Sequence, residues 1–289
     1  MGVLKQWVRT PKGDQLVAEW SDACGVDLLY AGVLATEDEL IDTEIAQPLI
    51  VAAAVIACEL LPLSRFMDTS TVVAGHSVGE LSALAIAGVV SAREAVVLAA
   101  ERGRLMAKAC AAEPTGMAAL GGESVESVVT MLADLHLGIA VNNGHGQITV
   151  AGRVDAIEAL LNQLPSGVRA RRIPVSGAFH SSYMNSAEIE FREILSTIDV
   201  RDPWCVLLSN SDGNPVDSGR DAVDKLVRQM TRQVRWDLCL DSIHSSSPAY
   251  IVELPPAGIL TRLSLRLTPS AIHIEVRSPE DLGLFDALQ

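Results

Sequence analysis

The chain has 289 residues, of which 49% are hydrophobic and 20% are charged, and its formal net charge is −14. This length and apolar content are enough for one large domain, or for a large domain with a smaller one inserted. The negative charge argues against nucleic-acid binding, because a polyanion would be repelled. The five cysteines are widely scattered and none forms a Cys-x-x-Cys pair, so neither a disulfide framework nor a metal site is indicated.

The sequence predicts a soluble, cytoplasmic protein that does not contact a membrane. Residues 1–7 contain no apolar core of signal-peptide length. The longest apolar stretch, Pro48 to Cys58, is too short to span a membrane, and Glu59 follows it.

The first 110 residues have mainly helical periodicity. Helices are expected over residues 15–30, 43–61, 79–89 and 92–110, and a strand is expected over residues 71–74. The helix at 43–61 is strongly apolar, with one broad stripe for burial. Ser91 and Glu94 have the spacing of a capping box at the start of the fourth helix.

After Pro114 the pattern changes to the order β-α-β-β-α-β. Strands are expected at 117–120, 137–141, 147–151 and 168–174, with helices at 125–135 and 154–164. This order is the ferredoxin-like pattern. We therefore expect a small ferredoxin-like subdomain, residues 115–175, inserted into a large domain made of residues 1–114 and 176–289.

The rest of the chain alternates between helices and strands. Helices are expected at 185–198, 222–231, 238–244 and 258–265, and strands at 206–209 and 250–254. A parallel sheet covered by helices fits this alternation. The predicted fold class is α/β, with a large α/β-hydrolase-like domain.

The segment Gly75-His76-Ser77-Val78-Gly79 lies between the expected strand at 71–74 and a helix. A Gly-x-Ser-x-Gly motif in this context is typical of a nucleophile elbow, where a strained turn projects the serine hydroxyl into a cleft. Gly75 and Gly79 lack a Cβ, so strand and helix can approach closely around the turn. The alternative interpretation is a glycine-rich turn with an idle serine.

Four further segments accompany this motif. They are Arg102-Gly103, Ala178-Phe179-His180, Gln229 ahead of Val234-Arg235-Trp236, and Glu253-Leu254-Pro255-Pro256-Ala257-Gly258. In all five segments the chain resembles malonyl-CoA:acyl carrier protein transacylases, and it is similar to the acyltransferase domains of polyketide synthases. In the last of these segments, Pro255-Pro256 departs from the Glu-x-Gly-Pro-Gly motif of the family. The resemblance implies ping-pong transfer of a malonyl group from malonyl-CoA to the phosphopantetheine thiol of acyl carrier protein, through a malonyl-serine.

The resemblance also assigns roles to residues. Ser77 is the expected nucleophile, and His180 is the expected base, since a serine hydroxyl needs a proton acceptor. A backbone carbonyl near Gln229 is expected to orient the imidazole, and the Val78 amide to stabilise the oxyanion. Arg102 is expected to bind the malonyl carboxylate through its planar guanidinium, the alternative being a surface charge.

Other residues are expected to contact the substrate. Phe179 and Val78 resemble the malonyl-selective pattern, in which a bulky Phe179 fills the space that a methyl branch needs. His76 adjoins the serine, but neighbouring side chains on a strained elbow usually diverge. Asn143, and more loosely Asn142, are further candidates for substrate contact.

The resemblance implies partners as well. Acyl carrier proteins are acidic, so a patch of Arg169, Arg171 and Arg172 is expected to offset the repulsion from the net charge of −14. Neither a metal nor a separate cofactor is expected, since coenzyme A is part of the substrate. The family's N-terminal Gly-Gln-Gly-Ser-Gln loop, which supplies an oxyanion donor, has no counterpart here; either the product starts upstream or activity is impaired.

Two alternative functions remain open at this stage. The first is a serine hydrolase or thioesterase with the same elbow, for which Asp212 or Asp237 would be the orienting carboxylate. No obvious Ser…Asp…His order supports it, and Arg102 argues against it. The second is a catalytically impaired protein of the acyltransferase type. The absence of a counterpart to the Gly-Gln-Gly-Ser-Gln loop supports this alternative.

Overall fold

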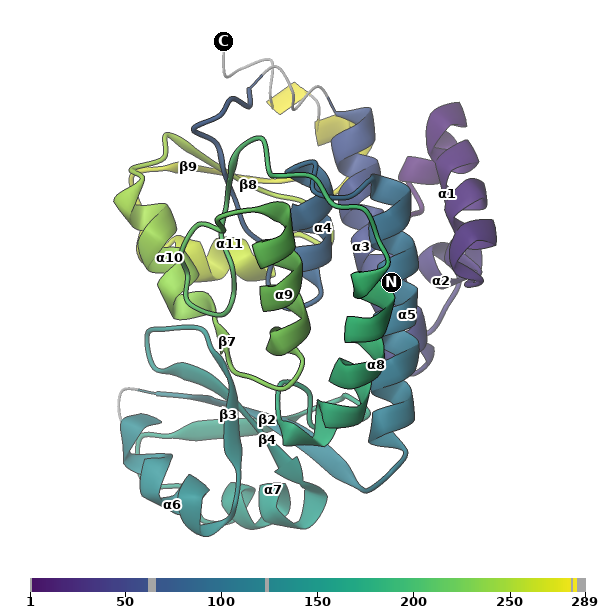
Figure 1. Ribbon diagram of the computed structural model, residues 1–289. Coiled ribbons are helices and arrows are strands. Elements are labelled where there is room, and N and C mark those ends of the chain that lie inside the picture. The colour runs from purple at the N-terminus through teal and green to yellow at the C-terminus, as the bar shows by residue number, and fades with distance from the viewer. Residues whose placement is uncertain (1, 62–65, 123–124, 282, 285–289) are drawn as a thin grey trace.

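The computed structural model of the chain describes residues 2–61, 66–122, 125–281 and 283–284, and its architecture is mixed α/β (Figure 1). The α-helices are α1 (Pro11–Cys24), α2 (Leu28–Val33), α3 (Thr43–Leu60), α4 (Gly79–Ile86), α5 (Ala92–Cys110), α6 (Val129–Asp134), α7 (Val154–Leu161), α8 (Asn185–Ser196), α9 (Gly219–Gln229), α10 (Trp236–Ser245) and α11 (Ile259–Ser264). The strands are β1 (Val72–Val73), β2 (Thr115–Gly121), β3 (Gly138–Asn142), β4 (Gln147–Arg153), β5 (Arg169–Ile173), β6 (Val206–Leu207), β7 (Val234–Arg235), β8 (Tyr250–Glu253) and β9 (Ile272–Glu275).

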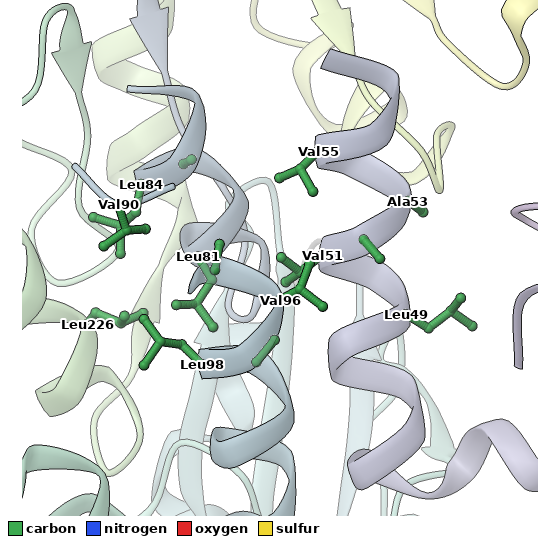
Figure 2. Packing of buried hydrophobic residues seen from close by; sticks show 14 of the residues in the cluster. Leu49, Val51, Ala53, Val55, Leu81, Leu84, Val90, Val96, Leu98 and Leu226 are labelled. Atoms are coloured by element: carbon green, nitrogen blue, oxygen red, sulfur yellow. The ribbon is translucent and has the colours of Figure 1, made fainter. Parts of the chain in front are cut away.

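Helices α3 and α5 pack side by side at the centre of the largest hydrophobic core. Figure 2 shows Val51 of α3 pointing toward Leu81 of α4 and Val96 of α5. The close approach depends on Gly103, because a Cβ there would lie 2.4 Å from the Thr43 carbonyl oxygen. The glycine of the Arg-Gly motif therefore serves the packing that places its arginine.

Helix α3 is longer than the apolar stretch from Pro48 to Cys58 suggested. Its 18 residues are long and apolar enough to cross a membrane by length and composition alone, yet 61% of them are buried inside the protein. A core helix meets the same criteria, because it too must present apolar side chains around most of its circumference. The contacts with α5 account for this apolar surface.

Most of the predicted helices are confirmed to within a few residues, including the capping box of Ser91 and Glu94 at α5. The prediction of one helix over residues 15–30 was wrong. Helix α1 ends at Cys24, because Gly25 adopts a left-handed conformation with φ of 73°. A separate helix, α2, begins after Asp27, whose side chain accepts a hydrogen bond from the Tyr30 N–H.

The largest sheet has five strands in the order β5-β2-β4-β3-β7. The first four strands pair antiparallel, and β7 pairs parallel with β3. Helices α6 and α7 cover the face that is turned away from the other helices (Figure 1), and a separate apolar cluster fills the space beneath them. The opposite face packs against α10 and neighbouring segments.

The expected single parallel sheet was wrong for the part of the chain that the structure describes. Parallel pairing occurs there in two separate two-stranded sheets, β1-β6 and β8-β9, besides the β3-β7 pair. Strands β7 and β9 were not predicted. A two-residue strand such as β7 has too little sequence to show a period, and only its pairing with β3 defines it.

Candidate active site

The turn between β1 and α4 has the geometry of a strained elbow. Ser77 adopts a left-handed conformation with φ of 54°, which is uncommon for a residue with a Cβ. A Cβ on Gly75 would lie 2.0 Å from the carbonyl oxygen of Gly79, so Gly75 permits the close approach of strand and helix. The same expectation for Gly79 was wrong, because a Cβ there would meet no heavy atom within 4 Å.

Ser77, His180 and Gln229 form a line of hydrogen bonds. The Ser77 hydroxyl lies 2.7 Å from His180 Nε2, and His180 Nδ1 lies 2.7 Å from the carbonyl oxygen of Gln229. A carbonyl only accepts, so Nδ1 carries the proton and Nε2 is left to accept one from the serine. The predicted Ser77–His180 contact and the backbone orienter at Gln229 are thus brought together.

The imidazole of His180 lies in a buried, positively charged environment. Burial, together with the nearby Arg102 charge, lowers the pKa of His180 to about 3, although the hydrogen bond to Gln229 acts in the opposite direction. His180 is therefore neutral at neutral pH. Neither Asp212 nor Asp237 orients it: Asp212 faces Lys225, and Asp237 pairs with Arg235.

His76 points away from the Ser77–His180 pair. Its Nε2 lies 3.0 Å from Asn143 Oδ1, and its ring meets that of Trp236 edge to face. Asn142, by contrast, is held by Asp237, to which its amide donates over 2.9 Å. The expected divergence of His76 from the serine is what the structure has, and Asn143 reaches the elbow through His76.

Arg102 is fully buried, with 1% of its surface exposed, so the surface-charge alternative was wrong. Nη1 donates to Gln47 Oε1 over 2.6 Å, and Nη2 donates to Gln229 Oε1 over 3.0 Å. Its Nε has no acceptor within the described residues. Burial lowers the pKa of Arg102 to about 10, which leaves the guanidinium charged at neutral pH.

Three polar residues of the site were missed from the sequence. Gln47 interrupts the apolar stripe of α3, and that interruption is the signal that could have found it. Glu80 directly follows the elbow motif, and burial raises its pKa to about 7. Asn210 lies in the loop after β6, is 0% exposed and contacts the elbow, and no local pattern distinguishes it.

Val78 follows Ser77 in the chain, and Phe179 precedes His180. Val78 is the N-cap of α4, and its N–H meets no acceptor in the part of the chain that the structure describes. Phe179 is half-buried and packs against both the large core and the apolar cluster on the sheet face that contacts α10.

The three arginines of the expected patch lie on two faces of the sheet. Successive side chains of a strand point to opposite faces of the sheet. On β5, Arg169 and Arg171 therefore point to one face, and Arg172 points to the other. Arg172 lies 3.7 Å from Glu158 of α7. Arg169 and Arg171 instead line a cavity of about 770 Å³ together with Arg266, which the sequence did not suggest.

The chain is similar to known proteins over nearly its whole length. The sequence model of the acyl transferase domain matches residues 21–275. This chain belongs to the acyl transferase family. A malonyl CoA-acyl carrier protein transacylase of Mycolicibacterium smegmatis is 45% identical over 99% of this chain and 100% of that protein. One of Mycobacterium tuberculosis is 45% identical over 97% of this chain and 93% of its own length.

Solved structures agree with the sequence relatives of this acyl transferase. The crystal structure of MCAT from Mycobacterium tuberculosis has a TM-score of 0.93 and 44% identity, covering 97% of this chain and 93% of that one. A type II PKS acyl-carrier protein in complex with its malonyl-transacylase includes a chain with a TM-score of 0.89 and 26% identity, covering 100% of this chain and 96% of that one.

The two glycines of the elbow are expected to respond differently to alanine. Gly75→Ala should lower the free energy of unfolding by about 1–3 kcal/mol, because the new methyl group would overlap the Gly79 carbonyl. Gly79→Ala, at the first residue of α4, should change it by less than about 1 kcal/mol. Urea denaturation of both variants measures the difference, and equal losses of stability would contradict the assignment.

Proposed function

We propose that this acyl transferase moves a malonyl group from malonyl-CoA to the phosphopantetheine thiol of acyl carrier protein through a malonyl-Ser77 intermediate. The observation that carries the proposal is the buried Arg102 guanidinium beside the Ser77–His180 pair, joined to it by Gln229. A hydrolase of neutral esters needs no such buried cation, whereas an acyl group that ends in a carboxylate does. The names of the 45% identical relatives support the same reaction.

The first half-reaction forms the acyl-enzyme. The Ser77 oxygen attacks the thioester carbonyl while His180 Nε2 takes the hydroxyl proton. The tetrahedral oxyanion is stabilised by the unpaired N–H of Val78. The carbon–sulfur bond then breaks, and His180 returns the proton to the sulfur of the departing coenzyme A.

The second half-reaction reverses these steps with another thiol. His180 takes the proton of the phosphopantetheine thiol, and the sulfur attacks the ester carbonyl of malonyl-Ser77. The bond between that carbon and the Ser77 oxygen then breaks, and His180 returns the proton to the Ser77 oxygen. Arg102 holds the malonyl carboxylate through N–H groups that Gln47 and Gln229 leave free, Nε among them. We place Phe179 at the α-carbon of the malonyl group, where it disfavours a methyl branch by about 1–3 kcal/mol.

His76 and Asn143 form one wall of the acyl site in this proposal. Their mutual hydrogen bond of 3.0 Å holds His76 away from Ser77, which leaves His180 as the base. No metal or separate cofactor takes part, and coenzyme A is part of the substrate. We place the reaction in the cytoplasm and in the fatty acid pathway.

The carrier protein is proposed to approach the cavity lined by Arg169, Arg171 and Arg266. On β5, Arg169 and Arg171 alternate with Ala170, which packs in the apolar cluster beneath α6 and α7, so these two arginines point to the opposite face of the sheet. Acidic carrier proteins would be attracted there despite the net charge of −14. Arg172 is left out of this surface because it faces α7.

The domain boundaries remain a proposal of the same kind. We assign residues 115–175 to a ferredoxin-like subdomain, supported by its four antiparallel strands in the order β5-β2-β4-β3 and by its separate apolar cluster. Residues 1–114 and 176–289 then form a hydrolase-like catalytic domain. Its support is the elbow between β1 and α4.

Incubation with malonyl-CoA tests the function directly. Intact-mass spectrometry should show one malonyl adduct on the unsubstituted protein and none on Ser77→Ala, because only Ser77 has its hydroxyl against the base. Addition of holo-acyl carrier protein should then discharge the adduct as malonyl-carrier protein. The absence of an adduct, or release of free malonate in place of transfer, would overturn the proposal.

The rate of Ser77 acylation is expected to resist acidification. An ordinary histidine base would lose half its activity near pH 6.5. The pKa of His180 is lowered to about 3, so the imidazole stays neutral and able to accept a proton well below that pH. Single-turnover acylation of a Glu80→Gln variant, which removes the neighbouring carboxyl whose pKa is about 7, should therefore show no titration with a midpoint near 6.5 between pH 7.5 and 5. A fall with that midpoint, at saturating malonyl-CoA, would contradict the shift.

Charge reversal on β5 separates its two faces. Arg169→Glu combined with Arg171→Glu should lower kcat/KM for carrier protein about tenfold at low salt and weaken its dependence on salt. Arg172→Glu, on the opposite face of the same strand, is the matched control and should have a smaller effect. Equal effects of the double variant and the control would exclude this docking surface.

A further inference from the structure

The strained turn at Ser77 needs a partner that holds it. A left-handed conformation of a residue with a Cβ costs about 1–3 kcal/mol and persists only where surrounding contacts determine it. Ser77 has φ of 54°, and the glycine beside it explains only why the turn has room. The hydrogen bonds that fix the backbone on both sides of His76 come from one side chain, that of Asn210.

Asn210 bridges the elbow with its two amide atoms. Its Oδ1 accepts from the Ser77 N–H over 2.8 Å, and its Nδ2 donates to the Gly75 carbonyl over 2.7 Å. A single carboxamide thus supplies one donor and one acceptor to the two backbone groups that flank His76. We call this pair of hydrogen bonds the elbow clamp.

The orientation of the Asn210 amide is itself fixed by its neighbours. The backbone of Asn210 is held first: its main-chain N–H donates to Glu80 Oε1 over 3.1 Å, and its main-chain carbonyl accepts from the Arg235 N–H over 2.7 Å. Gln229 Nε2 donates to Asn210 Oδ1 over 3.1 Å, which confirms that the oxygen and not the nitrogen faces Ser77. With no exposed surface, the side chain has no water to replace a lost partner.

We propose that Asn210 is a positioning residue of the acyl transfer reaction, whose amide holds Ser77 in the conformation that points its hydroxyl at His180. The inference rests on the proposed function for its rate measurement, but the clamp itself concerns only the reactivity of Ser77. Asn210 contacts neither His180 nor Arg102 directly. It acts on Ser77 through the elbow clamp, and its Oδ1 also accepts from Gln229, the residue that contacts both. The acylation step then slows more than substrate binding weakens.

The aspartate variant distinguishes a clamp from mere filling of space. In Asn210→Asp the protonated carboxyl can donate to the Gly75 carbonyl and accept from the Ser77 N–H, as the amide does. Once ionised, the carboxylate can only accept hydrogen bonds. It then no longer donates to the Gly75 carbonyl, and two acceptor oxygens face each other. Reactivity of Ser77 should therefore fall as the pH rises through the pKa of the introduced carboxyl.

Several charged or titratable groups surround this position. They are Glu80 of α4, Arg102 of α5, Asp212 in the same loop, Arg235 of β7, Asp237 and Cys239 of α10, His180, and His76 between the two clamped backbone groups. Glu80 is the one that would titrate together with the introduced carboxyl, because it accepts a hydrogen bond from Asn210 and its pKa is raised to about 7. The rates are therefore compared with Glu80→Gln in both proteins, and their ratio at each pH isolates the introduced carboxyl.

The test measures labelling of Ser77 by a fluorophosphonate probe and its acylation by malonyl-CoA between pH 5 and 8. Asn210→Ala should slow both about a hundredfold at every pH, as expected for a displaced nucleophile. Asn210→Asp should approach the unsubstituted rate at pH 5 and lose at least tenfold by pH 8. Asn214→Asp, an exposed amide in the same loop, is the matched control and should follow the unsubstituted profile.

A ratio for Asn210→Asp that does not change with pH, or an Asn210→Ala variant with an unchanged rate, would overturn the clamp. The fluorophosphonate arm does not need malonyl-CoA, so the clamp is tested even where malonyl transfer itself fails. If both variants fail to fold, hydrogen exchange of the Ser77 amide in the unsubstituted protein decides. Strong protection supports the clamp, and exchange at the rate of an exposed turn overturns it.

Discussion

The site depends on one residue at the end of α9, Gln229, which connects the base, the buried cation and the nucleophile. Its backbone carbonyl accepts from His180 Nδ1, and its side-chain oxygen accepts from Arg102. Its side-chain nitrogen donates to the Ser77 carbonyl over 3.3 Å and also to Glu80 and Asn210. Three polar groups of this buried residue, its backbone carbonyl and both side-chain amide atoms, are therefore used at once.

This sharing of Gln229 sets the electrostatics of the site. The imidazole of His180 stays neutral mainly because it is buried, and secondly because the buried Arg102 charge nearby would repel a second positive charge. Glu80 is a buried carboxyl near Arg102, and its negative charge partly compensates the positive charge of the guanidinium. The result is one buried cation available to a carboxylate, next to a base whose tautomer is fixed by a carbonyl. No carboxylate is needed to orient the histidine.

The five-stranded sheet shows how one structural feature divides charges that are adjacent in sequence. Arg171 and Arg172 are neighbours in the chain, but because β5 is pleated their side chains point to opposite faces of the sheet. One face carries Arg172 against α7, and the other opens to the cavity with Arg169 and Arg266. Strand β7 follows Gln229 in the chain and pairs with β3 of this sheet. This pairing holds the sheet next to the active site.

The sequence by itself determined the elements and the chemistry that depend on local pattern. Helix periodicity placed α3 and α5, the capping box marked the start of α5, and the elbow motif with Arg102, His180 and Gln229 indicated acyl transfer. The resemblance to a family, and not periodicity, supplied the roles of the residues.

Only the tertiary structure decided which distant groups meet. Asn210 lies 133 positions from Ser77 in the chain, and Gln47 lies 55 from Arg102, so no short-range pattern relates them. The pairing of β7 with β3, the role of Gly75 but not Gly79, and the separation of the β5 arginines also follow from packing and register. A sequence records which groups a chain has, but burial and hydrogen-bond partners depend on contacts between segments that only the folded chain brings together.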